Sequence, residues 1–312
     1  MIGIDVGGAN LKCVGDGGVS VHYCPLWKGS PIKGILSGHR WDDERAAVVM
    51  SGELADCFSS KDEGIEFIVR AVLSQFPGAR FYGTDGRFHS GPAPCLAAAN
   101  WLAAADWLRD SHPSAVLVDM GSTTTDIIPV PAFPSLLGLT DLSRLQRGYL
   151  LYTGMLRTNI ATTLQEVRVN GTETRTSSEY FAQSADAHLL LGHIDPAGYT
   201  CETPDKGEKS IAGAERRIAR VVCADPEEIG GAGIMDIAKA FWTAQQGLIA
   251  GEVRRIAAQY GASEVLTAGI GSELLAEVLG GKDLAEEIGE AADALPAFAV
   301  REVALRDQPF PP

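Results

Sequence analysis

The sequence predicts an α/β protein built from two similar lobes. Short β-branched runs alternate with segments whose apolar residues recur at helical spacing, which is typical of this class. The order of three strands, helix, strand and helix occurs in both halves, and each half opens with a strand that ends in aspartate before a glycine-containing turn. Such a duplicated unit predicts two lobes with a ligand-binding cleft between them.

The first half begins with three strands, which we expect where β-branched runs are separated by glycine-rich turns. They lie at Ile2 to Val6, Leu11 to Val14 and Val19 to Tyr23, and an irregular stretch from Pro25 to Asp43 follows. The later elements, in order, are a strand from Ala46 to Met50, a helix from Asp62 to Gln75, a strand from Ala79 to Gly83 and an alanine-rich helix from Pro92 to Leu108.

The second half repeats this order. Its first three strands are predicted at Ala115 to Asp119, Thr124 to Val130 and Gly148 to Thr153. They are followed by helices at Glu179 to Leu191, Ser210 to Val222 and Ile234 to Tyr260, a strand at Glu264 to Thr267 and a helix at Glu273 to Leu279. We therefore divide the chain into a first lobe, 1–112, and a second lobe, 113–312, with a helical insertion at about 179–223.

Composition excludes several classes of partner. Lys and Arg number 26 against 40 Asp and Glu, and the resulting net charge of -14 repels nucleic acid and anionic lipid. No apolar run reaches the ~18 residues of a membrane span, and the chain starts inside a strand rather than with a targeting peptide. Six scattered cysteines without a CxxC pair indicate structural thiols in a reducing cytoplasm. A homo-oligomer is compatible with the sequence.

The first glycine-rich turn lies in the segment from Asp5 to Lys12. Glycine permits backbone amides to approach a phosphate, so Gly7, Gly8 and Asn10 are candidate phosphate-binding residues. Asp5 ends a buried strand and is a candidate ligand of Mg²⁺, usually through water, while Lys12 supplies a positive charge.

The second turn repeats this pattern in the other half, from Asp119 to Asp126. Asp119 ends a strand and is a second candidate for Mg²⁺ and for catalysis, and Asp126 is a third metal candidate. The turn between them supplies glycine and hydroxyl groups for phosphate binding, at Gly121, Ser122, Thr123, Thr124 and Thr125. The threonines also suit an ordinary strand, since they are β-branched.

A third turn, Leu266 to Ser272, joins a strand to a helix through Gly269 and Gly271. A nucleotide or another phosphate-bearing ligand can lie against such a turn and the helix N-terminus. The segment is neither a Walker A motif, since it lacks Gly-Lys-Ser/Thr, nor a Rossmann fingerprint. The histidines form no HExxH pair either, so a catalytic zinc is not expected.

The three turns together resemble the phosphate 1, phosphate 2 and adenosine motifs of the actin, sugar kinase and Hsp70 superfamily (ASKHA). The resemblance implies a ribonuclease H-like fold in each lobe. It also implies Mg²⁺ as a cofactor and allows ATP as a further ligand.

Five longer segments resemble a hydantoinase/oxoprolinase-like family linked to tetrahydromethanopterin one-carbon metabolism. They are Gly3 to Asn10, Gly52 to Phe58, Ala98 to Trp101, Gly121 to Pro129, and Glu179 to Ala182 with Ser184 to Asp186. The resemblance implies a transferase of methanofuran or methylofuran biosynthesis. Such an enzyme joins an aminomethylfuran methyl diphosphate to a tyramine- or tyrosine-derived phenol and releases diphosphate.

The phenol of this reaction has an unperturbed pKa near 10 and needs a base. Glu53, Asp56 and Asp85 of the first lobe and Asp186 of the second are candidates, and all four also suit structural or surface roles. An ATP-dependent small-molecule kinase or a hydantoinase-like amidohydrolase with the same cleft remains the alternative. A non-catalytic nucleotide-dependent interaction module is disfavoured, because 312 residues leave little room beyond two lobes.

Overall fold

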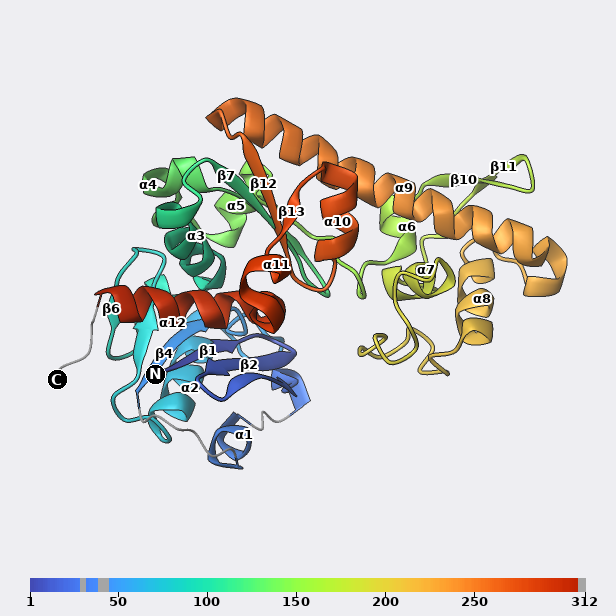
Figure 1. Ribbon diagram of the computed structural model, residues 1–312. Coiled ribbons are helices and arrows are strands. Elements are labelled where there is room, and N and C mark those ends of the chain that lie inside the picture. Colours follow the sequence, from blue (N-terminus) through green and yellow to red (C-terminus); the bar gives the residue numbers. More distant parts are fainter. Residues whose placement is uncertain (29–31, 39–44, 308–312) are drawn as a thin grey trace.

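The computed structural model describes residues 1–28, 32–38 and 45–307. Its two large sheets have the orders β3-β2-β1-β4-β5-β6 and β9-β8-β7-β12-β13. In each sheet the first strand in sequence pairs antiparallel with the second and parallel with a later one, as β1 does with β2 and β4, and β7 with β8 and β12. The five-strand order is therefore the same twice, which confirms the predicted duplicated α/β fold (Figure 1).

The first sheet is formed by the N-terminal third of the chain. Its strands are β1 Ile2–Val6, β2 Asn10–Gly15, β3 Gly18–Tyr23, β4 Ala46–Met50, β5 Arg80–Tyr82 and β6 Phe88–His89. The helices of this region are η1 Leu26–Lys28, α1 Ile32–Gly38, α2 Lys61–Leu73, η2 Pro94–Leu96 and α3 Asn100–Ser111.

The second sheet is formed by two separate parts of the chain. Its strands are β7 Ala115–Met120, β8 Thr125–Pro129, β9 Leu150–Leu151, β12 Glu264–Ala268 and β13 Lys282–Asp283. The associated helices are η3 Val130–Ala132, α4 Phe133–Leu136, α5 Asp141–Arg147, α10 Ser272–Leu279, α11 Ala285–Ile288, η4 Gly289–Ala294 and α12 Leu295–Asp307.

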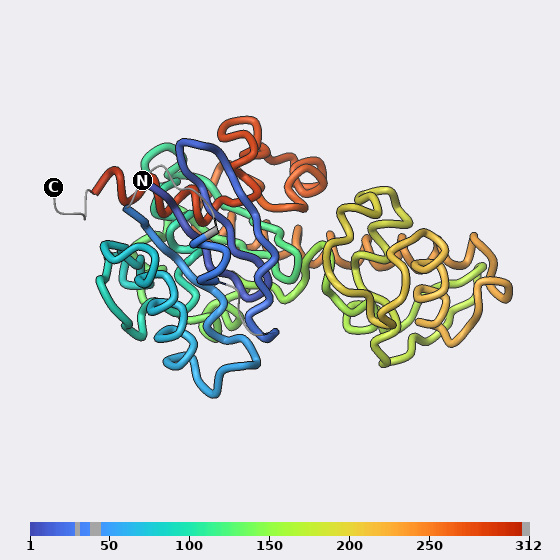
Figure 2. Tube along the Cα trace, turned by 90° about the horizontal axis from the view of Figure 1, so that it is seen from below, coloured from blue at the N-terminus to red at the C-terminus, as the bar shows by residue number. Residues whose placement is uncertain are grey.

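A third part of the molecule lies to one side of both sheets (Figures 1 and 2). It contains α6 Ile160–Thr163, β10 Glu166–Val169, β11 Thr172–Arg175, α7 Ser184–Leu190 and α8 Ile211–Arg220. All of these elements except β11 share a hydrophobic core with the first half of the long helix α9, Pro226–Tyr260, which continues to the second sheet. This core extends from Ile160 to Phe241 and is larger than the predicted insertion at 179–223.

Two helices lie between the sheets. Helix α12 packs on β1 and β4, and α3 packs on α12 and contacts β4 and β8, so one hydrophobic core joins the two halves of the molecule. The sequence prediction contained no helix after residue 279. Helix α12 is buried on several sides, from Leu295 to Ala304, and a helix covered in this way lacks a clear polar face. The division of the chain at residue 112 remains a prediction.

Other predicted boundaries are also wrong. The helix predicted from Ile234 begins at Pro226, and its backbone departs from helical geometry at Gly230. Helix α1 lies inside the stretch predicted to be irregular, Pro25 to Asp43, of which 29–31 and 39–43 are outside the described residues. The helix predicted from Pro92 begins only at Asn100, because the chain turns at Ala97 and at Ala98, whose φ is 47°. The helix predicted from Glu179 begins at Ser184.

No helix in the described part of the chain has the length and apolar character needed to cross a bilayer.

Candidate active site

The β1–β2 and β7–β8 hairpins are closed by the same backbone hydrogen bond. The amide of Gly7 donates to the carbonyl of Asn10 at 2.9 Å, and the amide of Gly121 donates to the carbonyl of Thr124 at 2.9 Å. Each hairpin tip is half-buried. The two turns singled out in the sequence are therefore equivalent positions of the two sheets.

An aspartate precedes each tip, with a charged residue opposite it on the next strand. Asp5 faces Lys12 across the first hairpin, and Asp119 faces Asp126 across the second. Burial raises the pKa of Asp5 to about 6, although the Lys12 charge acts in the opposite direction. Burial, together with the charges of Asp126 and Asp5, raises the pKa of Asp119 to about 7, although the Lys12 charge acts in the opposite direction. Asp5 and Asp119 thus approach one another from the two sheets closely enough for their charges to interact.

These carboxylates fit a divalent cation. The Oδ1 atom of Asp5 is buried and has no hydrogen-bond partner within the described residues, and oxygen ligands are those that Mg²⁺ prefers. A cation between Asp5 and Asp119 would offset both their repulsion and the cost of their burial. Asp126 is held by an ion pair with Arg144, so it is better placed to orient water than to bind the metal directly.

Lys12 reaches the segment that precedes the C-terminal helix. Its Nζ atom donates to the backbone carbonyl of Asp293 at 2.6 Å. The carboxylate of Asp293, in η4, is also one of the charges that raise the pKa of Asp119. Nothing in the sequence indicated Asp293, because it comes to the site only through the return of α12 to the first sheet.

The third glycine turn lies against the end of β7. Gly269 has a φ of 78°, and a Cβ atom there would lie 2.4 Å from Oδ1 of Asp119, so the position requires glycine. The amide of Gly271 donates to the carbonyl of Met120 at 3.1 Å. The second and third turns are therefore parts of one surface.

The hydroxyl residues of the second hairpin differ in accessibility. Thr125 is fully buried and donates through Oγ1 to the carbonyl of Thr153 at 2.7 Å, so this side chain supports the loop after β9. Ser122, Thr123 and Thr124 are half-buried and remain candidates for ligand contact.

Glu53 lies in the loop after β4, directly behind the first hairpin. The amides of Ser51 and Gly52 donate to the carbonyl of Val6 at 3.0 and 3.1 Å, which fixes this loop at the end of β1. The Glu53 side chain is buried, and within the described residues its Oε2 atom has no hydrogen-bond partner. Burial raises the pKa of Glu53 to about 7, although a hydrogen bond from the Ala98 backbone acts against this shift.

A second group of polar side chains connects Glu53 with the second hairpin. Arg144, in α5, forms ion pairs with Asp126 and Asp141, and its guanidinium carbon lies 4.4 Å from the centre of the Trp101 ring. The charge of Asp141 also raises the pKa of Glu53. Trp101 Nε1 and Arg144 Nε are buried and have no hydrogen-bond partner in the described ranges. We call Glu53, Trp101 and Arg144 the Glu53 cluster.

The Glu53 cluster has the properties of a substrate site. Buried polar atoms are usually hydrogen-bonded, so several unpaired ones in one connected group call for a ligand or water. The group offers one acceptor and two donors, and its Arg144 pairs with Asp126 of the second hairpin. Sequence reasoning proposed Glu53 but missed Arg144, which is one of 26 Lys and Arg residues and stands in no recognisable motif.

The other proposed bases lie in different surroundings. Asp56 is exposed, and Asp85 contacts His89 at 3.1 Å on a separate loop. Asp186 is fully buried in the third part of the molecule. It accepts hydrogen bonds from Arg217 at 2.7 and 2.9 Å and from Tyr199 at 3.0 Å, which is a structural role.

A cavity of about 530 Å³ lies elsewhere, between α5 and the end of α9. Arg147, Tyr149, Arg255 and Tyr260 are among the residues that line it. It is lined neither by the residues of the three glycine turns nor by Glu53, so we do not assign the reaction to it.

The chain is similar in sequence to one family of known proteins. The family model described as Hydantoinase/oxoprolinase matches residues 44–290. A relative from Methanocaldococcus jannaschii named (4-{4-[2-(gamma-L-glutamylamino)ethyl]phenoxymethyl}furan-2-yl)methanamine synthase is 35% identical over 319 residues, which cover 97% of each chain. A relative of the same name from Methanococcus vannielii is 37% identical over 164 residues, 53% of this chain and 74% of its own.

A solved structure has a similar fold. The nucleotide-free structure of an acetone carboxylase, described in connection with ATP-dependent acetone carboxylation, aligns with 96% of this chain and 69% of its own. The TM-score is 0.55 at 10% sequence identity, so this likeness shows the fold alone.

Proposed function

Because the chain belongs to the hydantoinase/oxoprolinase family, and because two curated relatives are phenoxymethylfuran-methanamine synthases, we propose that it is a transferase with diphosphate as leaving group. It joins an aminomethylfuran methyl diphosphate to a tyramine- or tyrosine-derived phenol, in methanofuran or methylofuran biosynthesis. The proposal includes small-molecule partners only and a cytoplasmic setting.

The observation that carries the proposal is that Asp5 and Asp119, one from each hairpin, interact through their charges, while Arg144 of the Glu53 cluster pairs with Asp126 of the second hairpin. Asp5 and Asp119 offer carboxylate oxygens for Mg²⁺, and the half-buried tips offer amides and hydroxyls to a diphosphate. When bound, Mg²⁺ would neutralise charge on the leaving diphosphate. Donors already in position at the leaving oxygens are the largest expected contribution to the rate.

The reaction breaks the bond between the furylmethyl carbon and the diphosphate oxygen, and the electron pair leaves with diphosphate. The furan ring stabilises the positive charge that develops on the carbon, and the phenol oxygen forms the new bond. The phenol proton passes to the Glu53 carboxylate. Because burial raises the pKa of Glu53 to about 7, its basicity is closer to that of a phenol than an ordinary carboxylate's would be.

The donors of the Glu53 cluster would orient the acceptor. Trp101 Nε1 and Arg144 Nε are buried without partners in the described part of the chain, so a phenol or its polar tail can satisfy them. Arg144 is itself fixed by Asp126 and Asp141, which keeps its position independent of the substrate.

Nucleotide dependence is the decisive test. The protein is incubated with the furylmethyl diphosphate, tyramine or γ-glutamyltyramine, and Mg²⁺ without ATP, and ether product and released diphosphate are measured. We expect equal amounts of both, and a greatly reduced rate of product formation in an Asp119→Asn variant. A failure to form the ether unless ATP is present would overturn the proposal.

The turn at Gly269 and Gly271 favours a second candidate, an ATP-dependent small-molecule kinase or amidohydrolase, because it lies directly beside Asp119. The furylmethyl alcohol with ATP separates the two functions. Phosphorylation of the alcohol, with no coupling of the diphosphate, would support the kinase and contradict the transferase.

A further inference from the structure

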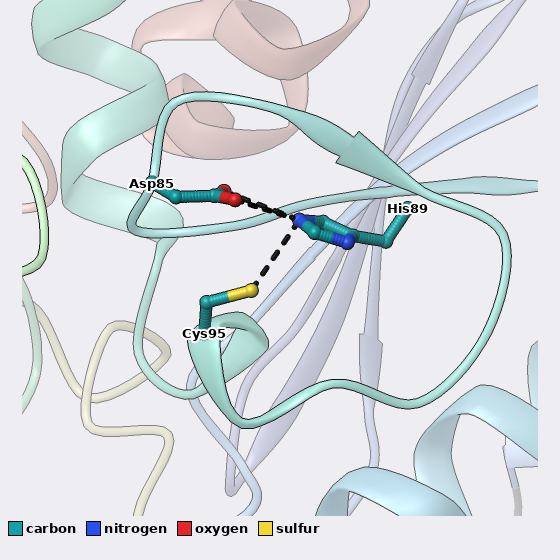
Figure 3. A group of neighbouring side chains, drawn as sticks. All are labelled: Asp85, His89 and Cys95. Carbon is teal, nitrogen blue, oxygen red and sulfur yellow. Dashed lines mark hydrogen bonds and ion pairs between the residues drawn. The ribbon is translucent and has the colours of Figure 1, made fainter.

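Three potential metal ligands that the proposed reaction does not use as a group lie together on the segment between β5 and α3. They are Asp85, His89 of β6 and Cys95 of η2. The Nε2 atom of His89 lies 3.2 and 3.1 Å from the two carboxylate oxygens of Asp85 and 3.3 Å from the sulfur of Cys95 (Figure 3). Their ligand atoms all lie within 4.8 Å of one another.

Hydrogen bonds among the three side chains explain this arrangement poorly. One imidazole nitrogen carries either one proton or one lone pair, yet His89 Nε2 faces both a carboxylate and a thiol. His112 provides a contrast, because its Nδ1 and Nε2 atoms contact two different carboxylates, those of Glu264 and Glu287. The three side chains of the β5–α3 segment instead converge on one point (Figure 3).

The surrounding backbone holds the donor atoms in place. The amide of Thr84 donates to the carbonyl of Cys95 at 2.7 Å, and the amide of Arg87 donates to Oδ1 of Asp85 at 3.2 Å. A Cβ atom at Gly83 would lie 2.7 Å from that oxygen and 3.0 Å from the sulfur of Cys95. The loop is therefore shaped around the three side chains, and such outer contacts tune metal sites.

We propose that Asp85, His89 and Cys95 bind one divalent ion of borderline softness, such as Zn²⁺. Oxygen, nitrogen and sulfur donors together suit zinc and its neighbours rather than Mg²⁺ or Ca²⁺. Within the described residues the group supplies three ligands, which leaves a fourth tetrahedral position for water. The Asp85 and His89 side chains are 38% and 28% exposed, so an ion can enter from solvent. Asp85, His89 and Cys95 form no CxxC or HExxH motif, so this site could not be predicted from spacing.

The test uses Co²⁺ as a spectroscopic probe for zinc. Anaerobic titration of the metal-free protein with Co²⁺ alone is followed by absorption, and Zn²⁺ is then added as competitor. We expect one thiolate-bound Co²⁺ per chain, seen as a sulfur-to-cobalt charge-transfer band, and loss of that band in Cys95→Ser. Asp85→Asn and His89→Gln should weaken binding at least about tenfold, a cost that even outer-shell changes bring to metal sites.

Two kinds of control variant accompany this titration. Gly83→Ala leaves all three ligands present but crowds them, so binding should weaken about tenfold. Cys223→Ser and His112→Gln remove an exposed thiol and a histidine of another site and should change nothing. A wild-type complex without the charge-transfer band, or a band that survives Cys95→Ser, would overturn the proposal. So would wild-type affinity in Asp85→Asn, which alters a partly exposed side chain.

Discussion

The two hairpins have the same backbone and different electrostatics. In each, an amide after the aspartate strand donates to a carbonyl three residues later, at 2.9 Å. Asp5, however, faces Lys12, whereas Asp119 faces a second carboxylate, Asp126, which Arg144 pairs with from α5. The two hairpins therefore have the same backbone geometry, and they differ in the charge of the residue opposite each aspartate. Burial is the main reason why the pKa of Asp5 is raised to about 6 and that of Asp119 to about 7. The charge of Asp126 adds to the shift of Asp119, whereas the charge of Lys12 acts against the shift of Asp5.

The largest expected effect tests whether the two hairpins act as one metal site. Asp5→Asn and Asp119→Asn should each lower kcat/KM for ether formation by about 10³-fold, since each removes a charge that would hold Mg²⁺ against the diphosphate. The double variant should be little worse than either single one, because residues that act as a unit are not additive. Full additivity of the two losses, measured by steady-state kinetics, would show two independent sites.

A variant of Glu53 tests the proposed base separately from the metal site, because Glu53 belongs to neither hairpin. Glu53→Gln should lower kcat about 10²-fold, the contribution of a general base. In the wild type at saturating Mg²⁺, the rate should rise with pH through about 7 as Glu53 loses its proton, and this limb should disappear in the variant. The exposed Asp56→Asn is the matched control and should retain the limb. If the rise in rate with pH persists in Glu53→Gln, another residue is the base.

The sequence predicted the parts of the site that follow from local spacing. A strand, an aspartate and a glycine turn are contiguous, so Asp5, Asp119 and the turn at Gly269 could be found without a structure. Arg144 and Asp293 could not, because α5 and η4 approach the site only through the packing of α3 and α12 between the sheets. The helix predicted from Pro92 is interrupted at Ala98, whose backbone is left-handed and donates a hydrogen bond to Glu53. The departure from the local helix prediction thus lies next to the proposed base.

The stability of the metal-free protein provides a smaller test of the first hairpin. The pKa of Asp5 is about 6 in the folded protein against an ordinary 3.8, so the folded state holds the proton more tightly. Stability should therefore fall as pH rises from about 4 to about 6 and stay low above that. Asp5→Asn lacks this loss, and we expect it to be about 1–3 kcal/mol more stable than the wild type at pH 8 and equal to it at pH 4.

Urea denaturation at both pH values, in EDTA, measures this difference. Adding Mg²⁺ with inorganic diphosphate should stabilise the wild type and leave Asp5→Asn unchanged. If Asp5→Asn is less stable than the wild type at pH 8 without metal, the Asp5 carboxylate already has a partner that offsets the cost of its burial. The assignment of Asp5 as a metal ligand would then be wrong.

The smallest expected effect distinguishes side chains of the second hairpin that stabilise the fold from those that contact the diphosphate. Thr125 donates from a fully buried position to the carbonyl of Thr153, so Thr125→Val should cost about 1 kcal/mol of stability and change kcat/KM less than twofold. Ser122 is half-buried at the tip, and Ser122→Ala should do the reverse, with a several-fold rise in KM for the diphosphate and unchanged stability. Both are measured by thermal unfolding and steady-state kinetics on the same preparations. An exchange of the two phenotypes would mean that the diphosphate lies deeper along β8 than the tip, and the equivalence of the two hairpins as anion sites would then fail.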